Sequence, residues 1–278
     1  MFRNRRLLIA TKHNKETVIA PLLERELGVT CFVPPDFDTD VFGTFSGEIK
    51  RTADAAEAVR AKCEAAMRRY NCDLAVSSEG SFGPHPALFF VPADEEILLF
   101  TDKQNNLEIM ARTISTETNF SGEWISSEQE LNSFAERAGF PSHALLMRSS
   151  ENDTHYLEKG ITDPAELVRV FREMRSLKGG VFLETDMRAC FNPTRMQVIA
   201  QTTEKLIGQI RSCCPRCTAP GFNVTGAAAG LPCSSCGRPT RSTLYYCYSC
   251  RQCNWSEERF FPHTKTAEEP MYCDHCNP

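Results

Sequence analysis

The stretch DLAVSSEGSFGPHP, Asp73 to Pro86, joins a short apolar run to a loop rich in glycine and proline. Its first five residues are typical of a buried strand. Glycine loses much backbone entropy on folding and proline lacks an N–H donor, so the strand is predicted to end in this loop. Ligands of open α/β sheets bind where strands end. We therefore expect Glu79 and His85 beside a binding site, with Gly80 and Gly83 letting the backbone approach a ligand.

Strand and helix patterns alternate on both sides of this stretch, as far as residue 211. Short apolar runs predict strands at residues 7–11, 30–34, 73–77, 87–91, 96–100, 108–114, 143–148 and 181–186. Helix-start signals are found at Asp54, Ser127, Asp163 and Asn192. This order predicts an α/β domain over residues 1–211, with a twisted mixed sheet and helices on both faces.

The composition indicates a globular protein without a membrane partner. The chain has 278 residues, of which 41% are hydrophobic and 24% charged, and its net charge is −5. No apolar run approaches the roughly 20 residues that cross a bilayer. The basic start MFRNRRLLIATKH has too short an apolar part for a signal peptide. We expect a cytoplasmic protein whose net charge gives no general attraction to nucleic acid.

Cysteines mark a second domain. Ten of the 14 lie between residues 213 and 278, and eight of these form four C-x-x-C pairs. Two such pairs supply the four thiolates of a tetrahedral zinc site. The sequence therefore predicts a double zinc-ribbon domain over residues 212–278 with two structural zinc ions, bound by Cys214, Cys217, Cys233, Cys236, Cys247, Cys250, Cys273 and Cys276.

The spacing of the pairs leaves two zinc arrangements open. Consecutive pairing joins the first pair to the second and the third to the fourth, and it is preferred because CPRC and CSSCG look like two knuckles of one ribbon. Crossed pairing joins the first pair to the third and the second to the fourth. The remaining potential ligands are expected to be bystanders; they are Cys213, Cys253, His263 and His275.

Two loops of the first domain contain lysine and arginine side chains suited to binding an anionic ligand. In TKHNKE, Thr11 to Glu16, Lys12 and Lys15 stand at a helix start, where backbone N–H groups favour anions. In ETDMRACFNPTRM, Arg188 follows a strand and Arg195 lies in the first turn of a helix. A cation there opposes the helix dipole, which indicates an anionic ligand or a carboxylate partner. An internal salt bridge to an aspartate is the competing interpretation.

Carboxylates suited to Mg²⁺ occur in the same domain. Asp38, Asp40 and Glu48 lie in a glycine-rich segment, and Asp186 ends a strand. Together with Glu79 they offer the oxygen ligands that Mg²⁺ takes alongside water and phosphate. His85 is a candidate general acid or base, and its flanking prolines equally suit a rigid structural histidine.

Two resemblances follow from these motifs. ATKHNKE, DTDVFGTFSGE, SSEGSFGPHP and GLPCSSCG resemble an uncharacterised bacterial family with a C-terminal double zinc ribbon. Residues 6–100 distantly resemble the inosine triphosphate pyrophosphatase and Maf superfamily, through LLIATKHNKETVIAPLL, GTFSGE and AVRAKCEAAMRRYNCDLAVSSEG. The second resemblance implies that fold, with Lys15 on phosphate, Lys62 facing a triphosphate, and Glu48 and Glu79 on Mg²⁺.

These observations favour a Mg²⁺-dependent hydrolase of a nucleotide or another phosphorylated metabolite. In this hypothesis Lys12, Lys15, Arg188 and Arg195 hold phosphate, and Glu48, Glu79 and Asp186 hold metal or position the attacking water. The alternative is a non-catalytic module whose ribbons bind nucleic acid or a protein partner. Residues 201–278 contain eight Lys or Arg against six Asp or Glu, with tyrosines and a tryptophan that suit base stacking.

Overall fold

The computed structural model describes the whole chain apart from residues 38–53, 152 and 179. The chain divides into two compact units, Met1–Ile207 and Gly208–Pro278. Across the described residues, no helix combines the length and apolar character needed to cross a bilayer.

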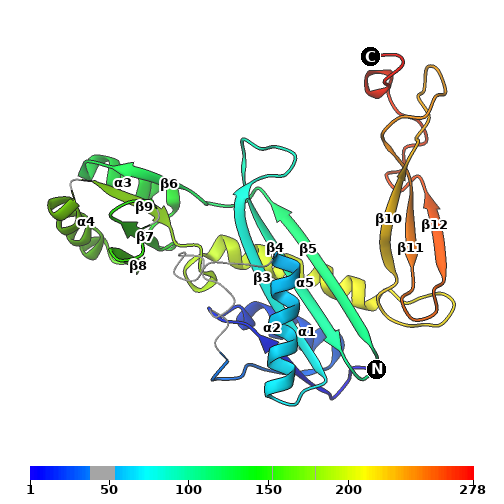
Figure 1. Cartoon of the computed structure of the whole chain (residues 1–278), viewed down its shortest axis with the longest axis horizontal. Coiled ribbons are helices and arrows are strands. Elements are labelled where there is room, and N and C mark those ends of the chain that lie inside the picture. Colours follow the sequence, from blue (N-terminus) through cyan, green and yellow to red (C-terminus); the bar gives the residue numbers. More distant parts are fainter. Residues whose placement is uncertain (38–53, 152, 179) are drawn as a thin grey trace. The chain divides into compact units, whose positions relative to one another are not determined.

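The first unit contains a five-stranded sheet in the order β2-β1-β3-β4-β5 (Figure 1). Strand β1 runs parallel to β2 and β3, whereas β3, β4 and β5 form an antiparallel meander. The strands are β1 (Arg6–Ala10), β2 (Thr30–Phe32), β3 (Leu74–Pro84), β4 (Pro92–Asp102) and β5 (Leu107–Ser115). Strand β1 pairs with β3 only as far as Ala10 opposite Ser77. The β3–β4 pair therefore continues beyond the end of β1, as far as Pro84 opposite Pro92.

Three helices accompany this sheet: α1 (Glu16–Leu27), α2 (Ala55–Arg69) and α5 (Pro193–Arg211). Figure 1 shows α2 in front of the sheet and α5 behind it. Helix α2 packs Val59, Cys63 and Met67 against alternate residues of β1, β3 and β4. Its predicted start is confirmed, because the Asp54 side chain accepts a hydrogen bond from the backbone N–H of Glu57.

A second, antiparallel sheet in the same unit has the order β6-β9-β7-β8. Its elements are β6 (Gly122–Ile125), α3 (Glu128–Ala138), β7 (Leu145–Arg148), β8 (Leu157–Ile161), α4 (Pro164–Lys178), β9 (Val181–Thr185) and the short 3-10 helix η2 (Ala189–Phe191). Leu131 and Phe134 of α3 and Phe171 of α4 lie in one apolar cluster with the strands. The α/β class is thus confirmed, but the strands belong to two sheets and not to a single one.

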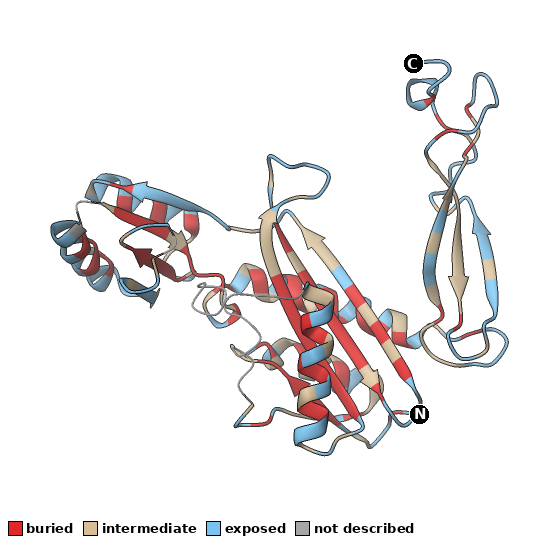
Figure 2. Cartoon of the chain, in the orientation of Figure 1, coloured by how far each residue is buried: buried red, intermediate tan, exposed pale blue. Residues whose placement is uncertain are grey.

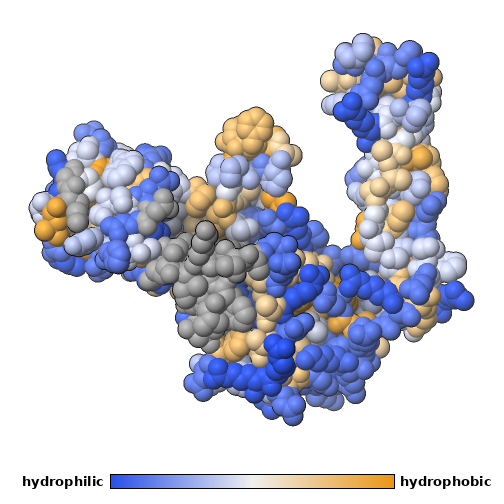
Figure 3. Space-filling view, in the orientation of Figure 1, coloured by the Kyte–Doolittle hydropathy of each residue, from blue (hydrophilic) through white to orange (hydrophobic). Residues whose placement is uncertain are grey.

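The segment at residues 87–91, expected to be a strand, is instead the tip of the β3–β4 hairpin. The backbone N–H of His85 donates to Val91 O, and the ring Nδ1 of His85 accepts the N–H groups of Ala87 and Leu88. Leu88, Phe89 and Phe90 are exposed there, and Figure 3 shows the apolar patch at the end of the hairpin. Prolines on both sides remove ladder donors, so the apolar run forms a turn.

The second unit is built on a small antiparallel sheet of β10 (Asn223–Ala229), β11 (Thr243–Ser249) and β12 (Ser256–Phe260), with a short 3-10 helix η3 (Pro270–Tyr272). Every residue of β11 is partly exposed, although β11 is the central strand. Figure 2 shows few buried residues in this unit. Four of its seven buried hydrophobic residues are cysteines, namely Cys214, Cys233, Cys250 and Cys273.

Candidate functional site

Six charged side chains are buried where β3 and β4 extend past β1. Each is at most 6% exposed, although charged residues of these kinds are rarely buried unless they are paired. They comprise three cations and three carboxylates: Lys15, Lys62, Arg195, Glu79, Asp94 and Glu96. The three cations and Glu79 are among the site residues predicted from the sequence.

Strand register places the carboxylates on opposite faces of the sheet. Glu79 pairs with Ile97 across the ladder, and both side chains lie on the face that α2 covers. There Glu79 forms an ion pair with Lys62 of α2. Glu96 lies opposite Gly80, so Glu96 and Asp94, two residues apart on β4, point to the other face.

Arg195 occupies this other face from the first turn of α5. Its Nε donates to Glu96 Oε1 at 2.6 Å, and its Nη1 donates to the carbonyl of Met187. Asn192 caps the helix by accepting the N–H of Arg195 at 3.0 Å. The predicted partner of Arg195 is therefore a carboxylate, and it is Glu96 and not an aspartate.

Gly80 permits the close approach of Arg195 to β3. A Cβ atom at Gly80 would overlap both the Arg195 guanidinium and the Glu96 carboxylate. The glycine that sequence analysis assigned to ligand approach instead makes room for this buried ion pair.

Lys15 connects the two faces. It precedes α1, and its Nζ lies 3.8 Å from Glu96 Oε2. Burial lowers the pKa of Lys15 to about 8, while Glu96 opposes that shift and the charges of Arg195, Glu79 and Lys62 also act on it. His13 and Asn14 take left-handed backbone conformations, with φ of 66° and 60°, in the turn that leads to this lysine.

Asp94 is a part of the cluster that sequence analysis missed. Its side chain is fully buried, and within the described residues neither carboxylate oxygen has a hydrogen-bond partner. Burial and the neighbouring Glu96 raise the pKa of Asp94 to about 8. A signal existed, because Asp94, Glu96, Leu98 and Phe100 alternate along β4 and so share one buried face.

The remaining predicted residues of the first unit are not members of this cluster. Asp186 and Arg188 form an ion pair within their own loop, with Arg188 Nη2 2.6 Å from Asp186 Oδ2. His85 holds the hairpin tip, about 20 Å of extended strand beyond Glu79. Lys12 is half-buried in the turn before α1. Asp38, Asp40 and Glu48 fall outside the described residues.

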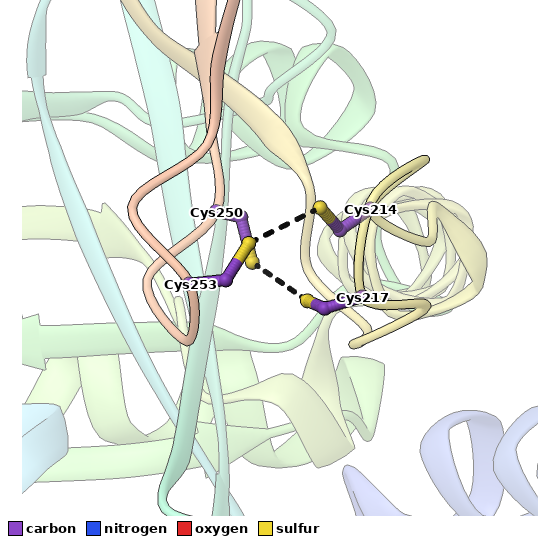
Figure 4. A group of neighbouring side chains, drawn as sticks. All are labelled: Cys214, Cys217, Cys250 and Cys253. Atoms are coloured by element: carbon purple, nitrogen blue, oxygen red, sulfur yellow. Dashed lines mark hydrogen bonds between the residues drawn. The ribbon is translucent and has the colours of Figure 1, made fainter.

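Two groups of four cysteines in the second unit could each hold a metal ion. The sulfurs of each group lie within 4.8 Å of one another. In the first group Cys214 Sγ is 3.7 Å from Cys253 Sγ, and Cys217 Sγ is 3.5 Å from Cys250 Sγ (Figure 4). A zinc tetrahedron with bonds of about 2.3 Å has sulfur–sulfur edges of about 3.8 Å, so both groups fit zinc. The second group is Cys233, Cys236, Cys273 and Cys276.

This grouping corrects two expectations. Consecutive pairing is wrong, because the first knuckle meets the third and the second meets the fourth. The third knuckle is Cys250–Cys253, so Cys253 replaces Cys247 as the candidate ligand. Cys247 lies within β11, opposite Gly226 and Glu258, where alternation of side chains prevents a knuckle with Cys250.

A repeated backbone feature explains the choice of knuckle. In all four knuckles the residue after the second cysteine donates its N–H to the carbonyl of the first: Thr218, Gly237, Asn254 and Asn277. Three of these donors have left-handed φ values, a conformation that asparagine and glycine adopt most readily. Asn254 follows Cys253, whereas an arginine follows Cys250. Asparagine at this position favours Cys253, but Thr218 takes the same conformation, so residue type alone does not fix the knuckle.

Comparison with known proteins assigns a family. No curated protein matches the chain, so its similarity to inosine triphosphate pyrophosphatases and Maf proteins stays a prediction. Residues 62–278 match the family described as a domain of unknown function, DUF6671. The matched segment includes both cysteine groups and every member of the buried cluster except Lys15. The chain therefore belongs to the DUF6671 family.

Proposed function

We propose that the buried charge cluster binds a small phosphorylated molecule, a nucleotide or another phosphorylated metabolite, and that the protein hydrolyses it with a divalent cation. The observation that carries the proposal is the convergence of two helix starts. Lys15 immediately precedes α1 and Arg195 lies in the first turn of α5, and both contact Glu96. Two cations from two helix starts that meet at one buried carboxylate suit a phosphate.

Stability does not account for this arrangement. Buried ion pairs are often no more stable than apolar side chains of the same volume, because removing charges from water is costly. Lys15 is buried at a helix start, where the dipole disfavours a cation. Perturbed pKa values of Lys15 and Asp94 in one cluster are typical of a site with a chemical role.

Cluster residues on the two faces of the first sheet would have different roles. Lys15 and Arg195 would bind phosphate oxygens, and Lys62 would hold Glu79 in place on the α2 face. Because Glu79 points to the α2 face, the attacking water would be oriented by the divalent cation and not by Glu79. A bound divalent cation would polarise the phosphoryl oxygens and lower the pKa of that water.

Hydrolysis of nucleotides and phosphoesters by the purified, zinc-loaded chain tests the proposal directly. We expect release of phosphate or pyrophosphate with Mg²⁺ or Mn²⁺, and binding of pyrophosphate in calorimetry. Lys15→Met should weaken pyrophosphate binding about tenfold or more. The matched control, Lys159→Met, removes an exposed lysine of β8 and should leave binding unchanged.

Stability distinguishes a binding role of Lys15 from a structural one. Lys15→Met removes a desolvated charge, and Glu96 keeps Arg195 as its partner. We therefore expect weaker binding without a loss of thermal stability at pH 7. A chain inactive on the whole panel that also fails to bind pyrophosphate would contradict the proposal.

A second candidate function, docking of a protein partner, is favoured by the aromatic and arginine side chains of the second unit. Arg259 lies 4.2 Å from the centre of the Tyr248 ring, and Trp255 and Phe260 are exposed. Residues 208–278 contain seven Lys or Arg against five Asp or Glu, and each four-thiolate zinc site would add about two negative charges. A positive field for nucleic acid is thus missing. Salt-dependent retention of the zinc-loaded protein on single-stranded RNA would favour nucleic acid instead.

A further inference from the structure

The Asp94–Glu96 pair of β4 presents three buried carboxylate oxygens that have no hydrogen-bond partner within the described residues: both oxygens of Asp94 and Oε2 of Glu96. Buried polar atoms in folded proteins are nearly always paired with protein, water or an ion. Asp94 and Glu96 lie two residues apart, so their side chains leave the same face of the strand. Each of these residues is fully buried.

We propose that Asp94 and Glu96 form a binding site for a divalent cation such as Mg²⁺ or Mn²⁺. Hard cations of this kind take carboxylate oxygens and complete their shell with water and substrate phosphate. The Oε1 atom of Glu96 accepts a hydrogen bond from Arg195 at 2.6 Å, which fixes the carboxylate. Its Oε2 atom has no hydrogen bond within the described part of the chain, and Lys15 Nζ lies 3.8 Å away, so this oxygen can still accept a cation. Glu79, the carboxylate expected from the sequence, points to the opposite face and pairs with Lys62.

Charge balance links this cation to the phosphate of the proposed function, on which this step rests. When its carboxylates are ionised, the cluster has three positive and three negative charges. A cation alone or a phosphate alone would leave a net charge in a site removed from water, which is costly. A divalent cation together with a dianionic phosphate leaves the cluster neutral. The two ligands should therefore strengthen each other's binding.

Direct binding of Mn²⁺ to the full-length, zinc-loaded chain tests the inference without an activity assay. Free Mn²⁺ is measured by electron paramagnetic resonance, with and without pyrophosphate. We expect a single Mn²⁺ site whose affinity increases about tenfold with pyrophosphate. Asp94→Asn should weaken Mn²⁺ binding about tenfold or more, because it replaces a charged ligand by a neutral side chain of similar shape.

Glu95→Gln is the matched control. Glu95 is the residue between the two proposed ligands, but its side chain lies on the other face of β4 and pairs with Arg112. This variant should bind Mn²⁺ as the wild type does. A second measurement uses only the wild type: Mn²⁺ should broaden the backbone NMR signals of Gly80, Asp94 and Glu96 before those of the second sheet.

The outcomes separate the cation site from the proposed function. Pyrophosphate binding without any Mn²⁺ site, or Mn²⁺ binding unaffected by Asp94→Asn, overturns the cation site and leaves the phosphate site standing. If buried water occupies the Asp94 and Glu96 oxygens, pyrophosphate should bind and no Mn²⁺ site should be found. Mn²⁺ binding that Asp94→Asn abolishes and pyrophosphate does not change supports the cation site and counts against the proposed function.

Discussion

The two units of this chain differ in the kinds of residue that they bury. In the first unit, apolar clusters around Leu131 and Val59 lie between sheets and helices, and nine charged side chains are buried among the described residues, six of them in the charge cluster. In the second unit most buried hydrophobic residues are cysteines of the two metal groups. A substantial core can tolerate buried charges that do not stabilise the fold, whereas a unit without one is expected to need a bound metal.

Metal removal should produce the largest contrast between the units. Structural zinc contributes about 10 to 16 kcal/mol to the folding of zinc-finger peptides, because these peptides have no other core. We expect two zinc ions per chain by metal analysis. Chelation should abolish the amide protection of β10 to β12 in hydrogen exchange while leaving the first sheet protected. Protection of β10 to β12 that survives complete zinc loss would contradict this view of the second unit.

Single cysteine variants sharpen the same point. Cys253→Ser should reduce the zinc content from two ions to one, because Cys253 lies 3.7 Å from Cys214 in the first group. Cys247→Ser is the matched variant, since Cys247 lies within β11 outside both groups. It should retain two zinc ions. The reverse result would restore Cys247 as the ligand.

In the first unit, Gly80→Ala should have the largest effect of a single methyl group on the charge cluster. The added Cβ overlaps Arg195 and Glu96, and breaking a buried ion pair costs about 3 to 5 kcal/mol. Gly83→Ala, on the same strand, meets no atom within 4 Å and should change stability little. Urea unfolding of both variants measures the difference. Equal stabilities would show that Arg195 can move away from β3 without cost.

Local patterns explain which parts of the fold could be predicted. Strand and helix types follow from short-range periodicity, and the caps at Asp54 and Asn192 were recognisable because their hydrogen bonds span three residues. The division into two sheets was not predictable in this way, since it depends on pairings such as Glu184 with Gly122 that are distant in sequence. Local pattern thus predicts elements better than their arrangement.

The candidate site shows the same limit. Lys62 was expected from a resemblance and Glu79 from its position at the end of a predicted strand, whereas the pairing of Arg195 with Glu96 was missed because 99 residues separate them. His85 was expected beside Glu79 because the two are close in sequence, but β3 continues to Pro84 and carries the histidine away. Residues a few positions apart on an extended strand lie far apart in space. Residues of different elements are brought together by strand pairing, which no local sequence pattern reveals.

The pH dependence of stability should give the smallest effect and the most direct test of the buried charges. Lys15 has a pKa of about 8 in the folded protein and an ordinary value of 10.5. Between these values the unfolded chain binds a proton that the folded chain does not, so stability rises with pH, by up to about 1.4 kcal/mol per pH unit. The window therefore runs from about pH 8 to 10.5, and below pH 8 the folded protein bears the full cost of burying the Lys15 charge.

Urea unfolding of the wild type and of Lys15→Met, both zinc-loaded, isolates this effect. Contributions of the second unit cancel in the difference, because the two proteins share it. The wild type should gain stability relative to Lys15→Met between pH 8 and 10, whereas Lys159→Met should follow the wild type throughout. A constant difference would mean that Lys15 keeps its ordinary pKa in the folded state, because Glu96 then compensates the burial of its charge in full.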